Sequence, residues 1–380
     1  MGTSLWMAET AQRELSCAPL REDLEADVCV VGAGFTGLTA ALELARAGRQ
    51  VCVVDAHAVG AGVSGHTTAK VAALHGTVYE ELRRKFGGRG AAAYAAANCA
   101  GVDHVADTAR ELAIDCALRR RPAVTYVRDP QQRDTIEQEA DAAVEAGLPA
   151  RLTTDVDLPY EVAAAVELPD QLEIQPRAYL LGVAREVLRL GGRIFEGTMA
   201  VQVGDGARPH VRTAGGQRIR ARDVIVASHY PFPDRGLFFM RLTPMRSYAI
   251  AVRAGAWTAR QMTISADQPT RSVRAHPGGD GGELLIVGGE GHKAGEDGDS
   301  AAERFGVLER FARDELGAGE VTHRWSAHDL RTADGVPYVG PLTPVSRHVL
   351  VGTGYRKWGL SNGTYAGRAL ADRILGRQDP

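Results

Sequence analysis

One stretch near the N-terminus constrains the fold of this chain more than any other. Positions 28–31 form a continuous apolar run, which is typical of a strand buried on both faces. Three glycines then follow at the spacing GxGxxG, at Gly32, Gly34 and Gly37. The first allows a tight turn, the second lets backbone approach a pyrophosphate, and the third lets a helix pack closely on the strand.

The residues after these glycines continue the same pattern. Good helix formers run from Leu38 to Ala47, and Gly48 ends the predicted helix. A second apolar strand is predicted at 50–54, and Asp55 follows Gly32 by 23 positions, where a ribose-binding carboxylate belongs. The helix N-terminus directs free N–H groups toward a phosphate. The stretch therefore predicts a βαβ unit that binds a dinucleotide, and a βαβ unit without a ligand is the alternative.

The bulk composition describes an ordinary globular protein of two domains. The chain has 380 residues, 44% hydrophobic and 24% charged, with a net charge of −3. This charge gives no reason to expect binding to nucleic acid or to an anionic membrane. The five cysteines contain no CxxC pair and no metal-ligand spacing, so we predict no metal site and a reducing compartment. Positions 1–23 lack the apolar core of a signal peptide, and no apolar run reaches membrane-spanning length, which predicts a cytoplasmic protein.

Periodicity and turn residues predict the remaining elements. We expect helices over 79–114 (as two helices), 131–146, 176–190, 302–315 and 364–375. We expect strands over 121–128, 166–174, 193–203, 210–213, 217–222, 223–227, 245–253, 283–287 and 348–352. The glycines of 288–291 are interpreted as a turn rather than a second nucleotide-binding motif, because no helix pattern follows them. Nucleotide-type elements at both ends and in the middle, separated by strand-rich stretches, predict two interleaved domains.

The C-terminal fifty residues give the chain a family resemblance. A turn reading DGVPYVGP starts at Asp334, and TGYRKWGLSNGT leads from Thr353 into the last predicted helix. Together with VVGAGFTGLTAALELARAG, PRAYL and DVIVAS in the same order, these segments resemble the D-amino-acid oxidase, glycine oxidase and sarcosine oxidase family of flavoproteins. The resemblance extends from about Asp27 to Gly376.

A narrower set of motifs resembles the flavin half of oxidoreductases that carry a C-terminal Rieske iron–sulfur domain. These motifs are SGHTTAK from Ser64, RSY from Arg246, GGEGHK from Gly288, Trp325-Ser, and Lys357-Trp-Gly. The sequence has no Cys-x-His pair able to hold such a cluster and ends at Pro380, where that domain would begin. A stand-alone relative and a piece of a longer protein are both open, and so is the electron acceptor.

The resemblance implies FAD as cofactor and a mixed α/β fold. It implies a Rossmann-like FAD-binding domain of the glutathione-reductase type, interleaved with a substrate domain built on an antiparallel sheet. We place the FAD-binding domain at 24–75, 172–235 and 325–380, the substrate domain at 76–171 and 236–324, and an N-terminal extension at 1–23. Backbone amides of 359–363, which open the last helix, are expected to stabilise the negative charge that develops on the flavin pyrimidine ring.

The residues that the resemblance assigns to FAD lie in six segments. They are Gly32, Gly34, Phe35, Thr36, Gly37, Asp55, Ala56, Gly65, His66, Thr67, Thr68, Val201, Ala227, Ser228, Gly354, Trp358, Gly359, Leu360 and Ser361. His66 stands where dimethylglycine and sarcosine dehydrogenases carry a histidine bound covalently to flavin. A non-covalent polar neighbour is the alternative for this histidine.

Enzymes of this family oxidise a C–N bond, so the resemblance implies an amine or amino-acid substrate. His292, with Lys293 beside it, lies where sarcosine-oxidase-like members place an active-site histidine, and an exposed polar turn is the alternative. Lys357 and Trp358 are expected to face the flavin. The lysine that binds substrate carboxylate in sarcosine oxidases aligns with Ser361, which leaves Arg274, Arg246 and Arg331 as candidates to replace it.

Three functions follow as hypotheses. The first is an FAD-dependent oxidase or dehydrogenase of amines or amino acids, reoxidised by oxygen or an external carrier. The second is a flavin-binding electron-transfer subunit that serves a partner protein. The third is an NAD-linked dehydrogenase that uses the same N-terminal motif.

Overall fold

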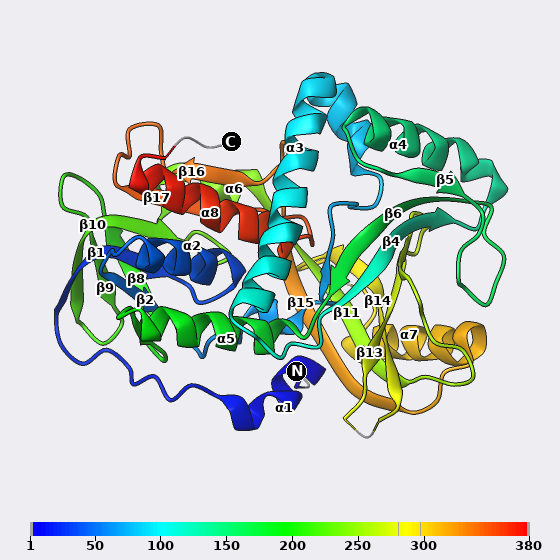
Figure 1. Cartoon of the computed structure of the whole chain (residues 1–380), viewed down its shortest axis with the longest axis horizontal. Coiled ribbons are helices and arrows are strands. Elements are labelled where there is room, and N and C mark those ends of the chain that lie inside the picture. The colour runs from blue at the N-terminus through cyan, green and yellow to red at the C-terminus, as the bar shows by residue number, and fades with distance from the viewer. Residues whose placement is uncertain (1–2, 280, 297, 378–380) are drawn as a thin grey trace.

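The computed structural model describes residues 3–279, 281–296 and 298–377. Two β-sheets lie side by side, each with its own helices, and the long helix α3 (Val78–Glu111) stands between them (Figure 1). The chain passes from one sheet to the other several times, as the predicted interleaving requires. The mixed α/β fold predicted from the sequence is confirmed.

The first sheet has a parallel centre built from the most apolar runs of the chain. Its strands, in spatial order, are β16 (Tyr338–Pro341), β17 (Val349–Thr353), β10 (Arg218–Val226), β1 (Leu24–Val31), β2 (Val51–Val54) and β7 (Arg193–Phe195), with β9 (His210–Thr213) beside β10 and β8 (Ala200–Gly204) beside β9. Helices α2 (Phe35–Arg46), α5 (Pro176–Arg189) and α8 (Ser361–Leu375) lie together on one face (Figure 1). A Cβ at Gly367 of α8 would meet Thr36 O at 2.5 Å, so α2 and α8 are in near-backbone contact.

The second sheet is antiparallel except for one parallel pair, β12 with β4. Its strands, in spatial order, are β15 (Val321–Thr332), β11 (Leu242–Arg253), β14 (Glu283–Lys293), β13 (Arg271–Pro277), β12 (Met262–Ser265), β4 (Arg119–Val127), β6 (Ala164–Glu173) and β3 (Lys70–Val71), with β5 (Arg151–Thr153) beside β6. The helices packed around it include α4 (Arg133–Glu145) and α7 (Ala301–Leu316), while the short α6 (Phe238–Arg241) leads into β11. Within the described residues, every helix is too short or too polar to cross a lipid bilayer.

Most predicted elements are confirmed, and the differences have physical reasons. Gly87 has φ 70° and breaks α3, as the prediction of two helices over 79–114 requires. The turn predicted at 288–291 is wrong, because β14 continues to Lys293 and its glycines pair with β11 and β13. A Cβ at Gly288 would meet Thr68 Cγ2 at 3.0 Å, so glycine here serves close packing of the sheet. The strands predicted at 217–222 and 223–227 are one strand, β10, whereas 193–203 divides into β7 and β8.

Further differences concern elements that the sequence did not predict or placed too late. The sequence did not predict strands β3, β5, β12, β13, β15 and β16 or the short helices α1 (Leu5–Glu9) and α6, and α8 begins three residues earlier than expected. The predicted domain boundary at 325 falls inside β15, which is hydrogen-bonded to the second sheet. By hydrogen bonding, the return to the first sheet therefore comes after Thr332.

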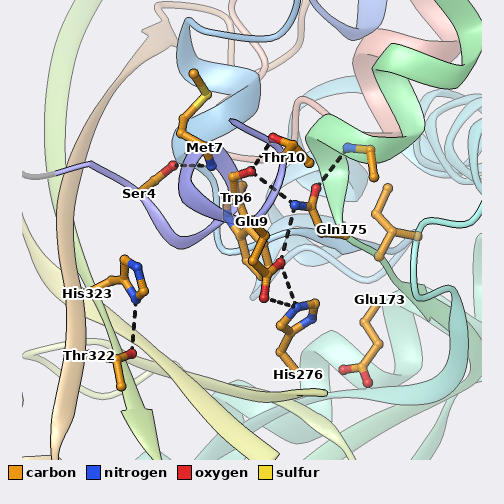
Figure 2. A network of polar contacts seen from close by, with 12 residues as sticks. Ser4, Trp6, Met7, Glu9, Thr10, Glu173, Gln175, His276, Thr322 and His323 are labelled. Atoms are coloured by element: carbon orange, nitrogen blue, oxygen red, sulfur yellow. Dashed lines mark hydrogen bonds and ion pairs between the residues drawn. The ribbon is translucent and has the colours of Figure 1, made fainter. Parts of the chain in front are cut away.

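The N-terminal segment, predicted as an extension, is joined by polar contacts to Gln175 before α5 and to His276 on β13 (Figure 2). Trp6 is fully buried and its indole Nε1 donates to Thr67 O at 2.7 Å, while Ser4 Oγ donates to Gly65 O. The Trp6 ring meets the ring of His276 at 4.9 Å, edge to face. Both oxygens of the Glu9 carboxylate lie 3.1 Å from Nε2 of the same histidine (Figure 2). Helix α1 therefore holds the 65–67 backbone from one side.

A buried group of charges lies on the second sheet next to this segment. Lys70 Nζ donates to Thr263 O at 2.6 Å and to Ser272 Oγ. The Arg274 guanidinium pairs with Glu173 at 3.7 Å. Burial lowers the pKa of Lys70 to about 7, helped by the Arg274 charge and opposed by Glu173.

We therefore expect Lys70 to make stability depend on pH. Between about 7 and 10.5 the unfolded chain keeps a lysine proton that the folded protein has released, so the free energy of unfolding rises with pH in this window. Lys70→Met removes this dependence. Denaturant unfolding at several pH values should show that the free energy of unfolding of the wild type rises relative to that of the variant by up to about 1.4 kcal/mol per pH unit. Parallel curves would contradict the buried-lysine assignment, and Lys85→Met on the surface is the matched control.

Candidate functional site

A cavity of about 650 Å³ runs between the two sheets. One end lies at the glycine-rich turn after β1, and the other is lined by β11, β15 and the segment after β17. Its lining includes Gly32, Gly34, Phe35, Thr36, Asp55, Ala56, His66, Thr67, Thr68, Val201, Ala227, Ser228, His229, Ser247, Tyr248, Ala327, His328, Asp329, Tyr355, Lys357, Gly359 and Leu360. Fifteen of the residues predicted from the sequence therefore meet at one cavity.

Glycine is required at two positions of the glycine-rich turn, because a side chain there would collide with neighbouring backbone. Gly32 has φ 111°, and a Cβ there would meet Ala227 O at 2.4 Å. A Cβ at Gly37 would lie 1.9 Å from Gly32 O, so the third glycine lets α2 approach the turn. Gly34 is the N-cap of α2 and provides no side-chain cap, which leaves the amides of the first turn available to an anion.

Asp55 fixes the turn as well as lining the cavity. One carboxylate oxygen accepts from Ala33 N at 2.7 Å and the other from His57 N at 2.8 Å. These bonds hold the carboxylate beside Gly32, where a ribose hydroxyl can reach it in a dinucleotide-binding fold.

The loop from Gly62 to Thr68 forms the wall between the two ends of the cavity. Its centre is a short 3₁₀ helix, η2 (Val63–His66), and His66 Nδ1 lies 2.9 Å from Gly62 O. Trp325 Nε1 donates to His66 O at 3.0 Å from β15, and its ring meets the Trp6 ring at 6.2 Å, edge to face. Two buried tryptophans thus hold the backbone of this loop from two elements.

The segment between β17 and α8 carries a strained backbone at the cavity. Arg356 and Lys357 have φ 50° and 73°, which non-glycine residues seldom adopt. Tyr355 is tied to Thr36 of α2 by a 2.8 Å hydrogen bond between their hydroxyls. Trp358 stacks on His75 at 4.5 Å and lies behind the lining rather than in it.

The prediction that the backbone amides of 359–363 contact the flavin needs one correction. Asn362 N donates to Trp358 O at 3.2 Å and Gly363 N to Gly359 O at 3.1 Å, because the turn before α8 is already helical. These two amides are therefore occupied. The amides of Gly359, Leu360 and Ser361 remain as candidates, and α8 has no side-chain N-cap.

Polar groups gather at the end of the cavity away from the glycine-rich turn. A Cβ at Gly291 would lie 2.8 Å from Lys357 Nζ and 3.3 Å from Ser247 Oγ, so the ammonium and the hydroxyl flank the same point. The Ser247 hydroxyl is buried without a hydrogen-bond partner among the described residues. Asp329 is partly exposed, and it also lines the cavity.

Burial is the main cause of the pKa shifts of the titratable groups at this end of the cavity. Burial raises the pKa of Asp329 to about 6, against backbone hydrogen bonds from Leu330 and Lys357 and the charges of Lys357 and Arg331. Burial and the Arg331 charge lower the pKa of Lys357, and Asp329 opposes them. Burial, with the neighbouring His328, lowers the pKa of His229 to about 4. Near pH 7 the cavity thus holds a mostly ionised carboxylate at Asp329 and a neutral histidine at His229, with the Lys357 side chain beside the carboxylate.

Several predicted residues lie outside the lining. Gly37, Gly65, Gly354, Trp358 and Ser361 lie behind it, where they support the turn, the loop or the start of α8. His292 lies on β14, not in a turn, and its ring stacks on Tyr248, a lining residue, at 5.8 Å. Lys293 is exposed and pairs with Glu296 at 3.6 Å.

The arginines proposed to bind a carboxylate are not in the lining. Arg274 is buried and donates to Thr68 O, Ile174 O and Ala275 O, with Glu173 as its ion-pair partner. Its role in the structure is to join β13 to the segments before β3 and α5. Arg246 and Arg331 lie on β11 and β15 outside the lining.

Sequence reasoning missed the polar end of the cavity. Ser247, Ala327 and Asp329 were not predicted, although Ser247 belongs to the quoted Arg246-Ser-Tyr motif and Asp329 follows Trp325-Ser by three positions. Ala327 and Asp329 lie on β15, a strand that the sequence pattern did not reveal.

The cavity fits FAD in shape and chemistry. Its glycine-lined end has amides and a carboxylate suited to the diphosphate and ribose of an ADP moiety. A Cβ at Gly34 would meet Ser64 Oγ at 2.9 Å, so even the smallest side chain would narrow this passage. The lining is mostly apolar, as a flat ring system requires.

Comparison with known proteins gives a family and several relatives. Residues 27–373 match the family model described as FAD dependent oxidoreductase. YhfW of Bacillus subtilis, named as a Rieske 2Fe-2S iron-sulfur protein, is 33% identical over 362 residues, covering 95% of this chain and 71% of YhfW. Gamma-glutamylputrescine oxidoreductase of Escherichia coli is 28% identical over 238 residues, covering 61% of this chain and 56% of that enzyme.

Solved structures share the fold. Glycine oxidase from Geobacillus kaustophilus has a TM-score of 0.78 at 20% identity, covering 94% of this chain and 96% of the oxidase. L-proline dehydrogenase from P. horikoshii has a TM-score of 0.75 at 17% identity, covering 95% and 96%. An L-amino acid deaminase from Proteus vulgaris has a TM-score of 0.75 at 14% identity, covering 96% of each chain.

Proposed function

This chain belongs to the family of FAD dependent oxidoreductases, and from that premise we propose that it oxidises a C–N bond of a small amine or amino acid. One observation carries the proposal: the cavity that suits FAD continues into a polar end with Lys357, Ser247 and Asp329. A small, charged substrate can be held there beside the cofactor. Bound FAD would supply the acceptor for the hydride that leaves the carbon bearing the nitrogen, and the imine product would hydrolyse in water.

The residues of this chain have three tasks in the proposed reaction. The turn at Gly32 and Asp55 holds the ADP half of FAD, and the loop at His66 lies beside the ring. The amides of Gly359 to Ser361, at the positive end of α8, favour negative charge on the ring. Lys357 orients the substrate by pairing with the carboxylate of the substrate. The sequence had suggested an arginine for this role.

The test is anaerobic reduction of the bound flavin by a panel of compounds. We choose glycine, N-methylglycine, D-alanine, L-proline and γ-glutamylputrescine, the last because the relative from Escherichia coli is named for it. Bleaching of the oxidised flavin spectrum by one of them supports C–N oxidation. A flavin that none of them reduces, although dithionite does, would refute the proposal.

Lys357→Met tests the orienting cation. A charge-assisted hydrogen bond contributes about 1.5–3 kcal/mol, so we expect the apparent Kd of a carboxylate substrate to rise about 10- to 100-fold. The Kd of a substrate without a carboxylate should change little. Rapid-mixing flavin reduction measures both, with Lys85→Met as the surface control. Equal effects on both substrate classes would contradict this role.

The remaining predictions about partners stand as proposals. An electron-transfer subunit is the second candidate, favoured by the relative named as a Rieske protein, and it predicts slow reoxidation by oxygen and fast reoxidation by an iron–sulfur protein. A cytoplasmic location and the absence of nucleic-acid ligands also stay predictions, and His66 stays open between a non-covalent neighbour of the flavin and a covalent link. Acid precipitation that leaves the yellow colour in the supernatant would exclude the covalent link.

A further inference from the structure

We propose that Asp329 is the catalytic base that removes a proton from the substrate ammonium group. This inference rests on the proposed C–N oxidation and names a residue for a step that the oxidation needs. At neutral pH an aliphatic amine with a pKa near that of lysine, roughly 10, is almost entirely protonated. A protonated nitrogen has no electron pair with which to form C=N.

The position of Asp329 is the first argument. The residue lies on β15 and lines the polar end of the cavity, together with Ala327 and His328 of the same strand. Across the sheet, β11 places Met245 opposite Asp329 and Ser247 opposite Ala327. The face that meets the cavity is therefore small or uncharged around this carboxyl, except for Lys357.

The surroundings of Asp329 are the second argument. The segment after β17 is fastened to β15 by Arg356 N, which donates to Leu330 O at 3.2 Å. This contact brings the backbone of Lys357 to the carboxyl of Asp329, and hydrogen bonds from Leu330 and Lys357 orient it. A carboxyl fixed in this way and open to the cavity can accept a proton from a bound cation.

The charged and titratable groups around Asp329 are few enough to name. Lys357 approaches from the segment after β17, and Arg331 lies on the same strand. His328 precedes it on β15 and is opposite Arg246 on β11, whose charge helps to lower the pKa of His328. Burial exceeds these influences and raises the pKa of Asp329 to about 6, which suits a base that works near pH 7.

The proposed step conserves atoms and electrons. An N–H bond of the ammonium group breaks, an O–H bond forms on Asp329, and the nitrogen keeps the electron pair. No oxidant or reductant takes part in this transfer. The freed pair is the one that forms C=N when the C–N bond is oxidised, and Asp329 later returns the proton to water.

Asp329→Asn tests the proposal through its pH dependence. The amide oxygen can still accept the backbone bonds that orient the side chain, but it cannot take the proton. The readout is the rate constant of anaerobic flavin reduction from pH 5 to 10, with the substrate from the panel that reduces the wild type fastest. In the wild type we expect the rate to fall below about pH 6, where Asp329 becomes protonated.

In the variant we expect a loss of about 10²-fold or more near pH 7, the range of a lost base. The loss should shrink as the pH approaches the pKa of the amine, since the substrate then arrives already neutral. Asp314→Asn, on α7 outside the cavity lining, is the matched control and should keep the wild-type profile. If Asp329→Asn does not retain FAD, Asp329→Glu replaces it, with an acidic limb displaced from the wild-type position.

Each outcome decides between the possible explanations. A wild type that no amine reduces refutes the proposed function, and Asp329 as base fails with it. A wild type that is reduced, together with a deficit of Asp329→Asn that stays constant from pH 7 to 10, refutes the base alone and assigns Asp329 to shaping the segment after β17. If the rate of flavin reduction falls at the same acidic pH in wild type and in Asp329→Glu, the role of Asp329 as base is also refuted.

Discussion

Gly37→Ala is expected to leave the protein without bound flavin. The new Cβ would lie 1.9 Å from Gly32 O and 3.1 Å from the Val30 side chain, and a backbone oxygen in the turn cannot rotate away. Either α2 moves off β1 or the turn opens, and both remove the amides from the diphosphate position. Overpacking of this kind costs about 1–3 kcal/mol of stability. Because the same turn is proposed to bind FAD, we expect the affinity for FAD to fall at least about 10²-fold.

The measurement is the flavin-to-protein absorbance ratio after purification, followed by titration of the apoprotein with FAD. Gly306→Ala in α7 is the matched control, because it is also a helical glycine. There the nearest atom to a new Cβ is Arg310 Nη1 at 3.6 Å, an ordinary contact. Alanine favours helix by up to about 1 kcal/mol, so this variant should be as stable as wild type or more so. A yellow Gly37→Ala protein with unchanged FAD affinity would contradict the assigned role of the third glycine.

Trp6→Ala is expected to destabilise the protein and to release the flavin faster. Truncating a fully buried tryptophan costs about 3–5 kcal/mol. The variant also loses the hydrogen bond to Thr67 O and the contact between the Arg274 guanidinium and the ring, 4.9 Å from its centroid. Since Thr67 lines the cavity, a freed loop should raise the rate at which FAD dissociates.

Denaturant unfolding and the recovery of flavin fluorescence on dilution measure the two effects separately. Trp6→Phe keeps most of the ring and loses the donor, so it should cost about 1–3 kcal/mol, the price of an unpaired carbonyl and a smaller side chain. Phe239→Ala, at a side chain that is 55% exposed, should stay within about 0.5 kcal/mol of wild type. Wild-type stability and flavin retention in Trp6→Ala would show that α1 is not needed to hold the loop.

The dinucleotide half of the site could be predicted because its signals are local. An apolar run, three glycines and an acid at a fixed distance report on a turn that few other residues can make, and Gly32, Gly34 and Asp55 lie together in the structure. Lys357 was assigned from the family resemblance, and it lies in the segment after β17, at the edge where parallel sheets bind ligands.

The substrate half could not be predicted because it breaks the rule used to find strands. In β15 the side chains that meet the cavity include Asp329, so a polar residue occupies the face where an apolar one is expected. Arg274 was predicted to bind a substrate carboxylate because of its charge. It is instead buried against Glu173 and has a structural role. Helix α1 has only 5 residues and no periodicity to detect, so its burial depends on distant partners.

The contacts of Trp6 also bear on the order in which the newly made chain can fold. Its ring packs against His276 and Trp325, and both of these residues are synthesised roughly three hundred residues after Trp6. Until then the hydrophobic N-terminal turn has no native partner and must stay in solution or with a chaperone. This turn can therefore dock, and hold the loop at Thr67, only after β13 and β15 of the second sheet have been synthesised.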